Sequence, residues 1–212
     1  MSVYDVQLGT RFLAALDADW ACLITTAEAW QQPARVADSP YGYLLHAIAH
    51  QHVHARAASS LLERLSKHFG GMPTPRQLCA TDPAEIKALG FSSAKTNALL
   101  DLAQHALQGG VPEEAEAVRL ADTSLHQQLT AIRGIGPWTV DMLLMFHLGR
   151  TDILPSGDFG VREGFRRLKK KPKQPSASEL TTLGKDWSPH RTLASWYLWQ
   201  AARLLPVPDS SE

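Results

Sequence analysis

Apolar side chains recur along this chain at the three- and four-residue spacing of amphipathic helices, and no stretch of useful length alternates as a half-buried strand does. Glycines follow several of the apolar runs, and Ser-, Thr- or Asp-containing pairs precede others. The pattern predicts helices over 3–16, 18–28, 41–53, 55–69, 94–108, 112–120, 122–132, 137–148, 159–168, 176–186 and 189–205, with short helices opened by Thr74-Pro75 and Asp82-Pro83. Helices this numerous and short predict an all-α, two-lobed helical bundle.

Composition narrows the class of protein. The 212 residues are 44% hydrophobic, which is enough for one sizeable core or two smaller ones. Cys22 and Cys79 have no CxxC partner, so the sequence predicts neither a disulfide framework nor an iron–sulfur cluster. No segment approaches the roughly 18 apolar residues of a membrane span. We therefore expect a cytoplasmic protein that does not contact the membrane.

The formal net charge is zero, which argues against binding nucleic acid by bulk electrostatics. One basic cluster could make local phosphate contacts, although a solvated helix end explains it equally well. Its members are Arg166, Arg167, Lys169, Lys170, Lys171 and Lys173.

Residues 129–164 contain the most distinctive pattern of the chain. Gly134 and Gly136 flank Ile135, so the backbone can turn tightly and approach another molecule closely. Pro137 then suits the first turn of a helix, whose amides can bind a phosphate. On spacing alone, a plain connection between two helices is the commoner explanation.

Asp158 follows the loop residues Pro155-Ser156-Gly157 and precedes a predicted helix. An aspartate in this place is a good N-cap, because its side chain accepts a hydrogen bond from the first helical turn. It is also a carboxylate delivered to a fixed position, as a catalytic group would be. On the spacing alone, the N-cap is the favoured role.

The string LTAIRGIGPWTVDMLLMFHLGRTDILPSGDFGVREGF, residues 129–165, closely resembles the helix-hairpin-helix DNA glycosylases. The resemblance continues in Ser39-Pro40-Tyr41, in residues 48–52 (IAHQH), in residues 90–103 (GFSSAKTNALLDLA) and in residues 187–199 (WSPHRTLASWYLW). It covers roughly residues 39–200 and is greatest for the alkylbase branch, DNA-3-methyladenine glycosylase II, in a short form without the N-terminal β-domain. Several matches in the correct order are more specific than any one of them.

This resemblance implies an enzyme that flips alkylated bases out of double-stranded DNA and hydrolyses the N-glycosidic bond, the first step of base excision repair. Asp158 matches the catalytic carboxylate, which would stabilise positive charge developing on the sugar and orient the attacking water. Trp138 stands where strand-cutting relatives have a lysine. Without that amine, covalent imine chemistry has no nucleophile, so we expect no strand-cleaving lyase activity.

The resemblance assigns further residues to the site. Trp138 and Trp199 match two tryptophans that line the base pocket, although core packing is the commoner fate of a tryptophan. Gln51 and His52 occupy the wedge region that fills the gap left by the flipped nucleotide. Gly134 and Gly136 would bind a DNA phosphate.

The family often holds a monovalent cation, Na⁺ or K⁺, through hairpin carbonyls, here those of Thr130, Ile132 and Ile135, and no other cofactor is expected. The active-site cleft would lie between lobe one, approximately residues 39–122, and lobe two, approximately residues 1–38 plus 123–212, which contains the hairpin at 129–148. The whole chain would then be one glycosylase unit acting as a monomer.

Two rival interpretations remain. His46, His50, His52 and His54 include pairs one helical turn apart, as zinc ligands can be, but no HExxH motif is present and no acidic residue falls within the run. Helix-hairpin-helix motifs also serve as non-catalytic DNA-binding modules. Asp158 and the paired tryptophan positions favour the enzyme.

Overall fold

The computed structural model describes residues 5–208, and all regular elements in that range are helical. The helices are α1 (Val6–Ala14), α2 (Ala18–Thr26), α3 (Pro40–His50), α4 (Ala55–Phe69), α5 (Pro75–Ala80), α6 (Pro83–Ala88), α7 (Ser93–Leu107), α8 (Glu114–Ala117), α9 (Asp122–Leu129), α10 (Pro137–Met142), the π-helix η1 (Leu143–His147), α11 (Phe159–Leu168), α12 (Ala177–Leu183), the 3₁₀-helix η2 (Gly184–Trp187) and α13 (Arg191–Leu204). The predicted all-α class is confirmed. Residues 3 and 4 of the first predicted helix lie outside the described residues.

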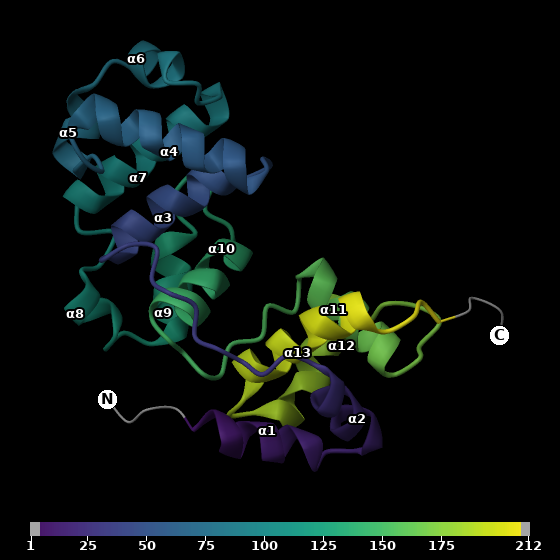
Figure 1. The fold of residues 1–212 in the computed structure, drawn as a ribbon. Coiled ribbons are helices and arrows are strands. Elements are labelled where there is room, and N and C mark those ends of the chain that lie inside the picture. Colours follow the sequence, from purple (N-terminus) through teal and green to yellow (C-terminus); the bar gives the residue numbers. More distant parts are fainter. Residues whose placement is uncertain (1–4, 209–212) are drawn as a thin grey trace. The chain divides into compact units, whose positions relative to one another are not determined.

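The chain divides into two compact units (Figure 1). The terminal unit comprises Met1–Pro33 and Gly149–Glu212, and the central unit comprises Ala34–Leu148. The division expected from the sequence placed the hairpin at 129–148 in lobe two, which the chain ends form. In the structure the hairpin belongs to the central unit, since η1 packs against α3 and α10 packs against α9.

In the central unit, α7 packs against α3, α5 and α6, and α4 packs against α3. Leu44, Leu45 and Ile48 of α3 and Leu99 and Leu102 of α7 are fully buried. The predicted caps form. The Ser92 hydroxyl accepts a hydrogen bond from the Lys95 amide, and Thr74 and Gln77 make a reciprocal capping box at the start of α5.

In the terminal unit, α11 and α13 lie side by side, and α1 and α2 pack beside them (Figure 1). Gly164 of α11 faces the backbone of α13, and a Cβ at this position would overlap the carbonyl of Leu198. The absence of a side chain therefore permits the close approach of the two helices. No helix within residues 5–208 combines the length and apolar character of a membrane span.

Some predicted helices are shorter or irregular. The predicted helix 112–120 is the single turn α8, and the helix predicted to reach residue 53 ends at His50. It ends there because its C-cap, Gln51, has an extended ψ of 129°, and His52 then adopts a positive φ of 54°. The helix predicted over 137–148 changes to π geometry at Leu143, an irregularity that hydrophobic periodicity does not reveal.

Candidate active site

Asp158 is the N-cap of α11. Its Oδ1 accepts a hydrogen bond of 2.8 Å from the amide of Val161, and its own amide donates to the carbonyl of Pro155. The capping interpretation from the sequence is therefore confirmed. The carboxylate also lies at the positive end of the helix dipole, where a negative charge is stabilised.

Trp199 of α13 donates a second hydrogen bond to the same oxygen, with 2.8 Å between its Nε1 and Asp158 Oδ1. The structure thus brings together two of the residues that the sequence assigned to the site. Two donors from different helices converge on Oδ1, so the position and the plane of the carboxylate are fixed before any substrate arrives.

Gly160, in the first turn of α11, makes room for this arrangement. A Cβ at Gly160 would lie 2.8 Å from Trp199 Cδ1 and 3.1 Å from Asp158 Oδ1. The first of these distances is shorter than a carbon–carbon contact allows, so the indole would have to move. Sequence reasoning missed Gly160, because its role depends on a contact with Trp199, which lies on a helix distant in the sequence.

We expect Gly160→Ala to reduce the single-turnover rate of base release by about 10- to 100-fold, because displacing the indole releases a hydrogen bond that orients Asp158. Gly157→Ala is the matched control. It changes the residue on the other side of Asp158, where an added Cβ meets nothing within 4 Å. Its rate should stay within about two-fold of wild type, and equal rates for the two variants would contradict the assignment of Gly160.

Three of the six members of the predicted basic cluster bind carboxylates within the protein. Glu163 accepts hydrogen bonds of 2.7 Å from both Arg166 and Arg167. Lys169 binds Asp17, the N-cap of α2, and Asp19 in the first turn of α2, at 2.6 and 2.9 Å. Arg166 and Arg167 thus pair within α11, and Lys169 joins the end of α11 to the start of α2. These contacts favour a structural role over phosphate contact for these three residues.

In the central unit, the hairpin is held from two sides. The Gly134 carbonyl accepts a hydrogen bond of 2.8 Å from Gln51 Nε2, and the Arg133 amide donates to Asp101 Oδ2 of α7 at 2.7 Å. Gly134 has a φ of 80°, in the region that favours glycine, and a Cβ there would lie 3.0 Å from Ala98 Cβ. The predicted wedge region and the predicted phosphate-binding turn are thus directly bonded.

Lys95 of α7 bonds to the helix end that precedes the predicted wedge residues Gln51 and His52. Its Nζ donates a hydrogen bond of 2.7 Å to the carbonyl of Ala49, in the last turn of α3. Burial lowers the pKa of Lys95 below its ordinary value. Next to this bond, Gln51, His52, Arg133 and Gly134 line a groove of about 630 Å³. Sequence reasoning assigned no role to Lys95 or Asp101, although both lie in the segment 90–103 that carried the resemblance and Lys95 matches the basic position of its motif.

Trp138, in the first turn of α10, is 52% exposed, which is against the core-packing alternative. It belongs to the central unit, whereas Asp158 and Trp199 belong to the terminal unit.

Among the hairpin carbonyls suggested as cation ligands, that of Ile132 already accepts the Ile135 amide at 3.1 Å. A carbonyl oxygen has two lone pairs, so this bond is compatible with a cation ligand.

The histidine run does not form a metal centre. His50 Nδ1 lies 2.9 Å from the carbonyl of His46, one turn earlier in α3. Within the described residues, no group of three or more His, Cys, Asp or Glu side chains could hold a metal ion. The structure therefore gives no support to the zinc alternative.

Comparisons with known proteins identify the family of this chain. Residues 45–190 match the family described as HhH-GPD superfamily base excision DNA repair protein. DNA-3-methyladenine glycosylase 1 of Schizosaccharomyces pombe is 36% identical over 196 residues, covering 91% of this chain and 86% of its own. The alkylbase DNA glycosidase-like protein mag2 of the same organism is 28% identical, covering 94% and 95%.

Solved structures give the same result. The S. pombe 3-methyladenine DNA glycosylase Mag1, in complex with abasic DNA, matches with a TM-score of 0.80 and 35% identity, covering 92% of this chain and 97% of that one. A DNA-3-methyladenine glycosidase from Bacillus halodurans matches with a TM-score of 0.82 and 30% identity, covering 92% and 89%. The chain belongs to the HhH-GPD superfamily of base excision DNA repair proteins.

Proposed function

We propose that this protein is a DNA glycosylase that removes alkylated bases from double-stranded DNA and so starts base excision repair. The observation that carries the proposal is the carboxylate of Asp158, held at the start of α11 by the Val161 amide and the Trp199 indole. The relatives named above support the same activity, because their names describe glycosylases for 3-methyladenine or alkylbases.

The chemistry explains why one fixed carboxylate can be sufficient. Alkylation at a ring nitrogen makes a base cationic, and the base is then a good leaving group. Breaking its glycosidic bond develops positive charge on the sugar, as in the oxocarbenium-like transition states of glycoside hydrolysis. Asp158 stabilises that charge and orients or deprotonates the attacking water.

The other assignments complete the proposal. Trp138 and Trp199 are the base-pocket residues that the resemblance implies, and each offers a π-face to the flipped cationic base. Gln51 and His52 fill the gap in the duplex, while Gly134 and Gly136 bind a phosphate. The carbonyls of Thr130, Ile132 and Ile135 hold a monovalent cation that stabilises the hairpin.

Trp138 replaces the lysine of the strand-cutting relatives, so we propose hydrolysis without lyase activity. The protein would act as a monomer on chromosomal DNA in the cytoplasm.

Mass spectrometry of the bases released from methylated duplex DNA tests this function. We expect free alkylated bases in solution and abasic sites in the duplex, with both strands intact until alkaline treatment. Binding to the duplex without any released base would instead indicate a non-catalytic DNA-binding module. Strand breaks that form without alkali would contradict the absence of lyase activity.

A further inference from the structure

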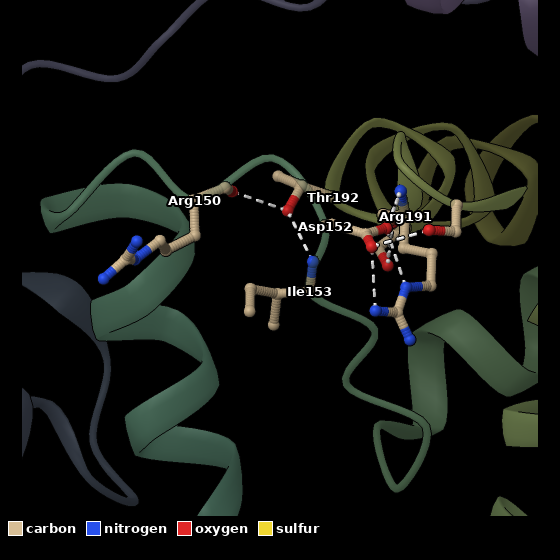
Figure 2. Close-up of polar contacts among 7 residues, drawn as sticks. Arg150, Asp152, Ile153, Arg191 and Thr192 are labelled. Atoms are coloured by element: carbon tan, nitrogen blue, oxygen red, sulfur yellow. Dashed lines mark hydrogen bonds and ion pairs between the residues drawn. The ribbon is translucent and has the colours of Figure 1, made fainter. Parts of the chain in front are cut away.

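The loop that leads to Asp158 is fixed to the start of α13 by an ion pair. Arg191 Nε lies 2.7 Å from Asp152 Oδ1, and Arg191 Nη2 lies 2.9 Å from Asp152 Oδ2, so the guanidinium binds both carboxylate oxygens (Figure 2). A bidentate pair of this kind fixes the direction of both groups as well as their distance. Asp152 lies six positions before Asp158 in the sequence.

Further bonds reinforce this contact. The Ser188 hydroxyl donates to Asp152 Oδ2 at 2.8 Å, and the Arg191 amide donates to Oδ1 at 3.3 Å. Burial acts to raise the pKa of Asp152, but the hydrogen bonds from Arg191 and Ser188 outweigh it and hold the pKa below its ordinary value. Asp152 is therefore ionised at neutral pH, as the ion pair requires.

Thr192 fixes the loop backbone on both sides of Asp152. Its hydroxyl donates to the carbonyl of Arg150 at 2.7 Å and accepts from the amide of Ile153 at 3.1 Å (Figure 2). Its amide donates to the carbonyl of Thr151 at 3.0 Å. Residues 150–153 are thus bonded to the first turn of α13 through both side chains and backbone. We call these contacts of Arg191 and Thr192 with residues 150–153 the loop clamp.

The same helix holds the other end of the loop. Trp199 lies eight residues after Arg191, about 12 Å further along the axis of α13, and binds Asp158. The loop segment 152–158 and the helix segment 191–199 are therefore joined at both ends. A six-residue segment can extend to about 20 Å, so chain length alone does not set the position of Asp158 relative to α13. The bonds at the two ends do.

We propose that Arg191 and Asp152 are positioning residues for the reaction at Asp158. The loop clamp sets where the loop begins on α13, and Trp199 then receives the Asp158 carboxylate at the correct place on the same helix. This inference rests on the proposed glycosylase function. Arg191 and Asp152 act through the loop and not by touching the base.

Single-turnover excision from methylated duplex DNA, with the full chain in excess, tests the inference through Arg191→Met. We expect the rate constant to fall about 10- to 100-fold, because small displacements of a catalytic group have effects of that size. The fraction of substrate converted and the dissociation constant for abasic duplex should each stay within about two-fold of wild type. Loss of folded protein would lower the active fraction and leave the rate constant of the remainder unchanged.

Lys169→Met is the matched control. Lys169 is also a partly buried cation of the terminal unit that binds carboxylates, but its partners Asp17 and Asp19 lie in or next to α2 and not on the loop. Its rate constant should stay within about two-fold of wild type. Arg191→Lys keeps the charge without the planar fork and should fall between wild type and Arg191→Met, so it provides a milder variant if the methionine variant folds poorly.

Asp152→Asn combined with Arg191→Met completes the test. Because the two residues act as one unit, the double variant should be no slower than the slower single variant. An unchanged rate constant in both Arg191→Met and Arg191→Lys would overturn the inference. A larger dissociation constant for abasic duplex at an unchanged rate constant would also overturn it, because Arg191 would then be a DNA contact. If wild type releases no base in this assay, the proposed function itself fails. If wild type releases bases and the variants do so with the same rate constant, the inference about Arg191 and Asp152 fails and the proposed function stands.

Discussion

Asp158→Asn is expected to lower the single-turnover rate of base release by about 1,000-fold or more, with almost no change in melting temperature. Asparagine caps a helix about as well as aspartate, and its side-chain oxygen can accept the bonds that Val161 and Trp199 now donate. It carries no charge to stabilise the developing cation or to activate water. If Asp158 has the proposed role, stability and catalysis should therefore separate in this variant.

Asp82→Asn provides the control for Asp158→Asn. Asp82 caps α6 in the central unit by accepting the Ala84 amide at 2.8 Å, and we assign it no part in the reaction. Both the rate and the melting temperature of this control should match wild type. Near-wild-type excision by Asp158→Asn would refute the role of this carboxylate.

The largest effect on stability is expected at Glu163, in the middle of α11. Its side chain is 9% exposed and accepts hydrogen bonds from Arg166, Arg167 and Gln174. Glu163→Gln leaves the buried guanidinium of Arg166 without a balancing charge. Breaking a buried pair in this way costs about 3 kcal/mol or more of the free energy of unfolding. Denaturant unfolding of wild type and variant at pH 7 measures the difference.

The pH dependence of this effect has a definite sign. Bonds from Arg166, with further bonds from Arg167 and Gln174, outweigh burial and lower the pKa of Glu163 from 4.5 to about 2. The stabilisation by Glu163 should thus be complete above about pH 4.5 and be lost as the pH falls through about 2. The difference between wild type and variant should shrink over that interval.

Glu85→Gln serves as the control for Glu163→Gln. Glu85 is a surface carboxylate that is 55% exposed and lies 3.6 Å from His68. Its replacement should change the free energy of unfolding by no more than about 0.5 kcal/mol. A loss as small as this at Glu163 would show that the buried cluster contributes little to stability.

The elements that could be predicted from sequence are those fixed by neighbouring residues. The apolar spacing, together with caps such as Ser92 and Thr74, located the helices because these signals act within a few residues. Asp158 could be predicted as an N-cap for the same reason. The assignment of the hairpin to the central unit could not be predicted from the sequence. It depends on the packing of η1 against α3, and these two elements are separated by more than 90 residues.

The candidate site shows the same limit. The roles of Gly160 and Asp152 depend on Trp199 and Arg191, which lie 39 residues further along the chain in each case. No local pattern reveals that an indole must pass close to one particular glycine, or that a loop carboxylate meets a guanidinium at the start of another helix. The resemblance identified Asp158 and Trp199 separately, but the hydrogen bond between them required the structure.

The indole of Trp199 has a consequence for how this enzyme can evolve. A side chain that only stacked on the base could be exchanged during selection for a new substrate range at little cost to the reaction rate. Trp199 also donates a hydrogen bond to Asp158, the carboxylate that we propose as catalytic, so the same exchange would slow excision of every base at once. Selection for a different range of damaged bases should therefore act more readily on Trp138, the other residue that we propose for the base pocket, which is 52% exposed and belongs to the central unit.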